Sequence, residues 1–212
     1  MRPLVMIGAG AGSLPRIIAE AAAAAGAPLA GYLDADEAPE PPTTPIPRLG
    51  DAARLDDAAF LAAHDFVLGV QGRGRRALAD ALVARGGRLP VLAHPAAIVS
   101  TTATIGEGTI LSAGVIVQSD ARIGRLCLLN TACTIDHDNV LGDEVSVAPG
   151  AHTAGRVTIR DGAFIGLGAV VINNVVVGAR ATVGAGAVVT RDVPEGATVV
   201  GNPARVLPNK SG

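Results

Sequence analysis

The chain has 212 residues, a formal net charge of -2, 27 glycines, no tryptophan and only three phenylalanines. This length suits one large domain or two small ones, built without a bulky aromatic core. The absence of a basic run and of an apolar stretch of about 18 residues argues against nucleic acid and membranes as partners. We therefore expect a cytoplasmic protein.

The N-terminal part of the chain is predicted to begin with a strand, a helix and a second strand. Residues 3–9 are apolar and precede a glycine-rich turn, and an alanine-rich helix follows. Ser13 is a suitable N-cap for this helix and Gly26 a suitable stop, while a second strand over residues 28–33 ends at Asp34. This order is half of a nucleotide-binding βαβ unit.

The turn between the first strand and the helix is the part of such a unit that would contact a phosphate. It contains Gly10, Ala11 and Gly12, but Ser13 stands where the dinucleotide fingerprint has its last glycine. A tight turn without a ligand is therefore an equally good interpretation of these residues.

The rest of the first 94 residues is predicted to alternate between helices and strands after an exposed loop. That loop covers residues 37–47 and contains five prolines. We expect a helix over 56–63, a strand over 65–70, a helix over 73–85 and a last strand over 89–92. The alternation favours a Rossmann-like α/β domain over residues 1–94, with a small parallel sheet.

A different pattern begins after the His94-Pro95 junction: from residue 99 to residue 189, an aliphatic side chain returns at every sixth position. This period fits neither an amphipathic helix nor a hairpin, and it is typical of a parallel β-helix built from hexapeptide repeats. The head of each hexad should point inward, with small side chains four residues later and glycines at the corners. Thr153 and Asn139 are polar exceptions to this pattern. We expect this domain to cover residues 95–212.

The two cysteines occupy equivalent inward positions in consecutive hexads. Cys127 and Cys133 are therefore predicted to be buried small side chains. A disulfide or a metal site is the alternative, but two thiols on adjacent faces are poorly placed to bridge, and the spacing is not a zinc pattern.

A β-helix has no deep pocket of its own, so polar groups that replace the corner glycines are candidates for a site. Two consecutive hexads without glycine contain Asn130, Asp136, His137 and Asp138. An imidazole that is hydrogen-bonded to a carboxylate has a fixed tautomer and higher basicity, as a general base requires. A solvated histidine at a corner is the alternative interpretation. The other histidines, His64, His94 and His152, are predicted to be structural.

Three features together resemble a known family. They are the small N-terminal domain, the Gly201-Asn-Pro-Ala204 tail, and the run Asn130-Thr-Ala-Cys-Thr-Ile-Asp-His137-Asp138-Asn-Val-Leu-Gly-Asp. The chain resembles the bacterial sugar O/N-acyltransferases over nearly its whole length. This family includes sialic acid O-acetyltransferases and N-acetyltransferases of nucleotide-linked 4-amino-4,6-dideoxy sugars. The resemblance implies a left-handed β-helix that assembles as a homotrimer, with active sites between adjacent copies.

The resemblance also implies the roles of individual residues. His137 matches the general base, Asp138 the acid that orients it, and Gly155 a backbone amide that stabilises the oxyanion. Acetyl-CoA would be the co-substrate, without a metal. Its contacts would be Ser146, which replaces a histidine of some relatives, and the residues Leu167 and Ala185. The nucleotide sugar would contact Gly10, Ala11, Gly12, Asp34 and Asn130.

The predicted function is direct transfer of an acetyl group from acetyl-CoA to the amine of a nucleotide-linked 4-amino-4,6-dideoxy sugar. A sialic acid-type O-acetyltransferase is the nearest alternative and differs only in its acceptor. A metal hydratase like γ-class carbonic anhydrase would need three histidines around zinc, whereas the coils contain only His137 and His152. A non-catalytic scaffold is the last alternative.

Overall fold

The computed structural model describes residues 2–9, 13–34, 45–70, 72 and 74–208. The predicted glycine turn of Gly10, Ala11 and Gly12 lies outside the described residues. The chain divides into two compact units, Met1–Pro95 and Ala96–Gly212. No helix in the described part of the chain is long and apolar enough to span a membrane.

The first unit contains a four-stranded parallel sheet with the strand order β3-β2-β1-β4. The central strand β1 is buried along its whole length, as expected inside a parallel sheet, and the edge strand β4 is buried as well. The strands are β1 (Leu4–Ile7), β2 (Leu29–Asp34), β3 (Arg48–Asp51) and β4 (Asp65–Leu68).

Three α-helices and a 3-10 helix connect the strands of this unit: α1 (Ser13–Ala24), the 3-10 helix Ala52–Asp56, α2 (Ala58–Ala63) and α3 (Arg75–Ala84). The predicted end of the first helix is confirmed. Gly26 has a φ of 69°, and Ala27 N donates to Ala22 O at 2.9 Å, which closes the helix with a Schellman motif.

Two features of this unit differ from the prediction. The strand β3 was not expected, because its four residues are half-exposed and do not form an apolar run. The predicted last strand over 89–92 is wrong: residues 89–91 are irregular, and only the short β5 (Leu92–Ala93) follows, outside the four-stranded sheet. Pro90 has no N–H to donate to a strand ladder, which disfavours pairing there.

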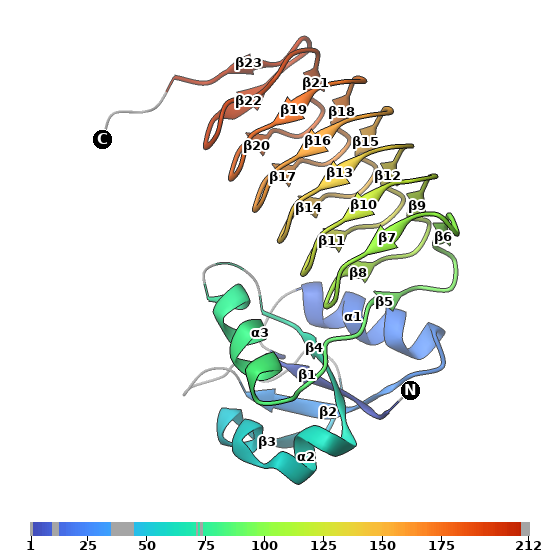
Figure 1. The fold of residues 1–212 in the computed structure, drawn as a ribbon, viewed down its shortest axis with the longest axis vertical. Coiled ribbons are helices and arrows are strands. Elements are labelled where there is room, and N and C mark those ends of the chain that lie inside the picture. The colour runs from blue at the N-terminus through green and yellow to red at the C-terminus, as the bar shows by residue number, and fades with distance from the viewer. Residues whose placement is uncertain (1, 10–12, 35–44, 71, 73, 209–212) are drawn as a thin grey trace. The chain divides into compact units, whose positions relative to one another are not determined.

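The second unit is a parallel β-helix, as the period of six predicted. Figure 1 shows its short strands stacked coil upon coil in three ladders. The first ladder contains β7 (Thr104–Ile105), β10 (Arg122–Ile123), β13 (Val140–Leu141), β16 (Thr158–Ile159) and β19 (Val176–Val177). The second contains β8 (Ile110–Leu111), β11 (Leu128–Leu129), β14 (Ser146–Val147), β17 (Phe164–Ile165), β20 (Thr182–Val183), β22 (Thr198–Val200) and the antiparallel β23 (Arg205–Val206). The third contains β6 (Ile98–Val99), β9 (Ile116–Val117), β12 (Thr134–Ile135), β15 (His152–Thr153), β18 (Val170–Val171) and β21 (Val188–Val189).

The head of each hexad is the second residue of one of these short strands and stacks on its equivalents 18 residues away. Ile123, for example, pairs with Ile105 and with Leu141. From Leu111 to Val189 these side chains are buried, whereas Val99 in the first coil is 37% exposed. Each buried aliphatic side chain stabilises the coil by roughly 1.5–3 kcal/mol before chain entropy is subtracted.

Both cysteine side chains are buried in the β-helix, as predicted, and both are free thiols. Burial raises the pKa of the Cys133 thiol to about 12. This thiol is therefore protonated at neutral pH and is not available as a nucleophile.

Candidate active site

His137 lies at the corner that joins β12 to β13. The stacked corners between the third and the first ladder form an edge of the β-helix, which we call the His137 edge. Asp138 takes the left-handed position of this corner with a φ of 58°, and its N–H donates to Ser119 O of the preceding coil at 3.0 Å. Aspartate tolerates this conformation better than most side chains do.

The imidazole of His137 is hydrogen-bonded to the carboxylate of Asp138. The distance from Nδ1 to Oδ2 is 2.7 Å, and the two side chains are 46% and 52% exposed. Because an ionised carboxylate can only accept a hydrogen bond, Nδ1 carries the proton and Nε2 keeps its lone pair. The pair therefore presents a nitrogen with a free lone pair on a half-exposed side chain.

The second flanking carboxylate belongs to Asp136. Among the described residues it forms no hydrogen bond with the ring. Its Oδ1 instead accepts a hydrogen bond from His137 N at 2.7 Å. It thus holds the backbone of the corner, while Asp138 alone orients the imidazole.

Gly155 lies directly against the ring of His137. A Cβ atom at this position would lie 2.5 Å from Cε1 of His137 and closer still to Nε2, so only glycine leaves room for the ring. The next residue is tied to the same corner, because Arg156 N donates to His137 O at 3.0 Å. Among the described residues, the amide of Gly155 has no acceptor. A backbone donor and a basic nitrogen thus meet on one edge.

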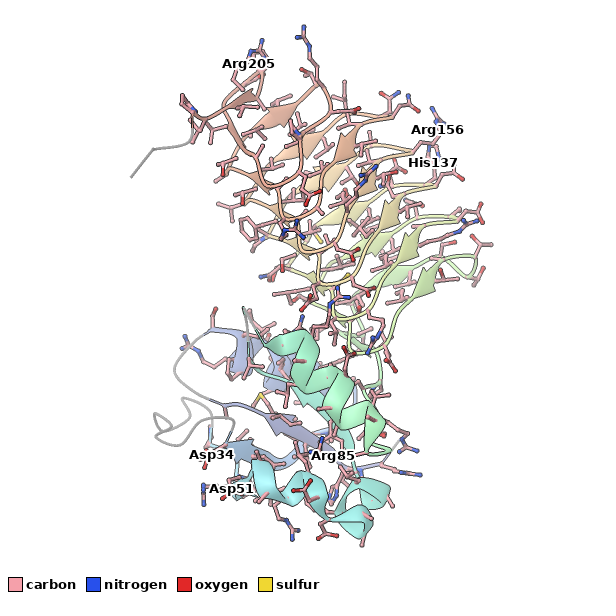
Figure 2. The ribbon with its side chains drawn as sticks, turned by 60° about the vertical axis from the view of Figure 1, so that its left-hand side comes forward. Asp34, Asp51, Arg85, His137, Arg156 and Arg205 are labelled. Carbon is pink, nitrogen blue, oxygen red and sulfur yellow. The ribbon has the colours of Figure 1, made fainter. Side chains whose placement is uncertain are left out.

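Arg156 is a residue near this pair that the sequence analysis did not single out. It stands one coil after Asp138 at the same corner position, and its Nε donates to Asn174 Oδ1 at 2.9 Å. Figure 2 shows Arg156 and His137 together at the same edge. The spacing of 18 residues from Asp138 is the signal that could have identified it.

The residues expected to contact coenzyme A lie elsewhere on the β-helix. Leu167 and Ala185 are exposed and occupy equivalent corners of successive coils between the second and third ladders, where Gly186 N donates to Leu167 O at 2.8 Å. We call this the Leu167 edge. Asn130 starts a corner of the same edge, and Ser146 lies on β14.

The third ladder separates the Leu167 edge from the His137 edge. A hexad spans roughly 20 Å at ~3.3 Å per residue, so one chain does not bring the two edges together. Asn130 is engaged locally, since its Oδ1 accepts from Thr131 N at 2.8 Å.

Asp34 lies in the first unit at the carboxyl end of β2. Its side chain is buried and forms an ion pair with Nε of Arg48, and this hydrogen bond raises the pKa of the Arg48 guanidinium. The other carboxylate oxygen, Oδ1, is buried and has no hydrogen-bond donor among the described residues. A buried oxygen without a donor is costly, and a bound hydroxyl could satisfy it.

The structure shows no group of three or more histidine, cysteine or acidic side chains that could hold a metal ion, within the residues it describes. His152 is exposed on β15, and its Nδ1 lies 2.9 Å from Thr134 Oγ1.

No family model matches the chain. The GDP-perosamine N-acetyltransferase of Escherichia coli O157:H7 is 40% identical over 92 residues, which are 43% of this chain. The match spans 42% of that relative.

Several solved structures match almost the whole chain. The acetyltransferase domain of PglB from Neisseria gonorrhoeae FA1090, in complex with acetyl coenzyme A, is 37% identical with a TM-score of 0.89, covering 97% of this chain and 99% of that one. The chain belongs to the sugar acyltransferase family of hexapeptide-repeat proteins. A histidine-to-alanine mutant of GDP-perosamine N-acetyl transferase from Caulobacter crescentus, in complex with CoA and GDP-perosamine, is 32% identical with a TM-score of 0.90, covering 98% and 97% of the two chains. The stacked parallel strands fit the left-handed β-helix of these acetyltransferases.

The packing of His137 on Gly155 predicts the effect of adding a single methyl group. Gly155→Ala should displace the imidazole from Asp138, because the new Cβ would occupy the space of the ring. We expect the NMR signal of His137 Nδ1 to shift in this variant. Gly162→Ala is the control: a Cβ there would meet only Arg180 Cγ at 3.5 Å, and the strain of its φ of 66° falls on the corner between β16 and β17, away from the His137 edge. An unchanged Nδ1 signal in Gly155→Ala would contradict the packing.

Proposed function

We propose that this protein transfers the acetyl group of acetyl-CoA to the amine of a nucleotide-linked 4-amino-4,6-dideoxy sugar. The observation that carries this proposal is the His137–Asp138 pair packed on Gly155. The solved structures that match 97% and 98% of this chain include complexes with acetyl coenzyme A and with GDP-perosamine. Family membership and local geometry therefore support the same chemistry.

The residues of the His137 edge suit direct transfer. His137 Nε2 takes the proton of the sugar amine as the amine attacks the thioester carbonyl, and Asp138 stabilises the imidazolium that forms. The amide of Gly155 donates to the oxyanion of the tetrahedral intermediate. When the intermediate collapses, the carbon–sulfur bond breaks, and His137 returns the proton to the leaving thiolate. No acyl-enzyme is needed, and both cysteines are buried.

The separation of the two edges supports a homotrimer with active sites between adjacent copies. Leu167, Ala185 and Ser146 of one copy would hold acetyl-CoA against the His137 edge of its neighbour. One coil also exposes a run of apolar side chains that suits a contact surface: Phe164, Leu167, Val170 and Ile172, at 44%, 58%, 38% and 37% exposure. Scattered exposed apolar residues are ordinary, but several in one coil favour burial by a partner or ligand.

The first unit would bind the nucleotide as a Rossmann-like domain. Its strand order β3-β2-β1-β4 is that of the first part of a doubly wound sheet, in which ligands bind beyond the carboxyl ends of the strands. Asp34 is at such an end, and its buried Oδ1 lacks a donor among the described residues. A ribose hydroxyl would supply that donor, and the turn of Gly10, Ala11 and Gly12 would contact the phosphates.

Replacing His137 tests the reaction. With acetyl-CoA and GDP-perosamine, or a UDP- or dTDP-linked 4-amino sugar, we expect the wild-type protein to release free coenzyme A. His137→Ala should lower kcat by about 10²–10⁴-fold, because the proton acceptor is lost. His152→Ala is the control and should stay close to wild type. Turnover that survives in His137→Ala would contradict the mechanism, and wild-type turnover only with hydroxyl acceptors would establish O-acetylation instead.

Subunit complementation tests the shared site. His137→Ala and Leu167→Glu should each inactivate the protein, by damage to opposite sides of one site. When the two variants are co-expressed, random assembly should restore about a quarter of the wild-type activity, since that share of sites combines two intact edges. Each variant alone serves as its own control. A fully active monomer in light scattering, or no recovery in co-assembled trimers, would contradict the arrangement.

Asp34→Asn tests the nucleotide site. The loss of a charged acceptor should weaken the binding of GDP about 10- to 100-fold in calorimetry. Asp51→Asn is a matched control: Asp51 pairs with Asp34 across β2 and β3, but it is exposed, and its Oδ1 accepts from Ala53 N at 3.0 Å. Equal effects of the two substitutions would argue against a specific role for Asp34.

A further inference from the structure

Two polar side chains meet inside the β-helix beneath the His137 edge. Thr153 replaces an aliphatic head of a hexad, and Asn139 replaces a small inward residue. Both are buried, with relative exposures of 4% and 0%. Neighbouring coils place valine at the equivalent positions, Val171 and Val157. Closure of a coil therefore does not require polar groups at these positions.

The side-chain amide of Asn139 spans the base of the Gly155 corner. Its Nδ2 donates to Thr153 Oγ1 at 2.6 Å, and its Oδ1 accepts from Val157 N at 2.6 Å. These two partners stand two residues before and two residues after Gly155. Asn139 itself is two residues after His137. One side chain from the His137 corner thus forms hydrogen bonds on both sides of Gly155.

Thr153 connects the same two corners in the opposite direction. Its hydroxyl donates to Thr134 O at 3.2 Å and accepts from Asp136 N at 3.3 Å. With the bond from Asn139, the hydroxyl uses its one donor and both of its acceptor sites. Asp136 in turn accepts from His137 N, so the contacts continue up to the imidazole-bearing residue.

The Gly155 corner is closed differently from two other corners of the same edge. There, the amide of the fourth corner residue bonds to the carbonyl of the first, as in Ala103 N to Ser100 O at 3.1 Å and Ala121 N to Gln118 O at 3.4 Å. At the Gly155 corner, the equivalent amide, Val157 N, donates to Asn139 instead. The conformation of this corner therefore depends on a hydrogen bond to the coil that carries His137.

We infer that Asn139 and Thr153 are positioning residues, which fix the His137 imidazole relative to the amide of Gly155. This inference rests on the proposed acetyl transfer, in which both groups act on the same carbonyl. Neither residue touches the substrates, since both are enclosed in the coil. Their effect on the reaction passes through the spacing of the two corners.

A comparable contact elsewhere in the β-helix provides the control. Thr109 is also fully buried, and its Oγ1 donates to Gly124 O at 2.9 Å and accepts from Cys127 N at 3.0 Å. These corners join the first and second ladders and lie away from the His137 edge. Thr109→Val therefore removes the same kind of interaction from another edge.

The test compares Thr153→Val, Thr153→Ser and Thr109→Val in the full chain, after thermal unfolding has shown that each is folded. Thr153→Val should lower kcat about 10- to 100-fold with KM values for both substrates almost unchanged, because a small displacement of reacting groups is enough. Thr153→Ser keeps the hydroxyl and should restore kcat, and Thr109→Val should keep the wild-type kcat. A wild-type kcat in Thr153→Val, or equal losses in Thr153→Val and Thr109→Val, would overturn the inference.

A second measurement separates this inference from the proposed function. The NMR signal of the His137 ring reports the geometry without any substrate. It should shift in Thr153→Val and in Asn139→Val, and stay in place in Thr109→Val. If the wild-type protein acetylates none of the sugars, the proposed function fails, and the positioning of the ring is still decided by this signal. A ring signal that is unmoved in Thr153→Val and Asn139→Val would overturn the inference.

Discussion

The stacking register of the coils is the constraint on which the rest of the β-helix depends. Parallel pairing places each residue over the one 18 positions later, as His152 pairs with Thr134 and with Val170. A slip of one residue would turn the buried aliphatic side chains outward, so the hydrophobic core fixes this register strongly. The same register puts the ring of His137 on Gly155. The core that stabilises the fold therefore also sets the geometry of the candidate site.

Coils contact only their neighbours, so the interior of the β-helix can change locally without loss of the fold. The pair of Asn139 and Thr153 is such a local change. A polar atom in this interior is destabilising unless it is hydrogen-bonded, and each side-chain polar atom of Asn139 and Thr153 has at least one partner. Replacement of an aliphatic head by threonine removes about 0.8 kcal/mol of hydrophobic stabilisation for each buried methylene that is lost. The hydroxyl adds side-chain hydrogen bonds between two coils that are otherwise joined by the backbone ladder.

The chemistry proposed for this protein is distributed over surfaces that a single chain keeps apart. In the proposed reaction, the His137 edge would supply a base and an oxyanion donor, and the Leu167 edge would supply exposed small and apolar side chains. The first unit contributes a parallel sheet with the buried carboxylate of Asp34 at the end of a strand. In the proposed homotrimer, the two edges of adjacent copies would form one site.

The sequence by itself determined the β-helix, because a period of six is a local signal repeated many times, and it identified His137 and Asp138 because they interrupt that signal. The strand β3 was not predicted, and the predicted strand over 89–92 was wrong. A single short segment is hard to assign from sequence, because distant partners decide whether it pairs. Only the tertiary structure decided what the polar exceptions Asn139 and Thr153 bind. Their side-chain bonds join residues that are 14 or more positions apart, so the stacking of the folded coils selects these partners.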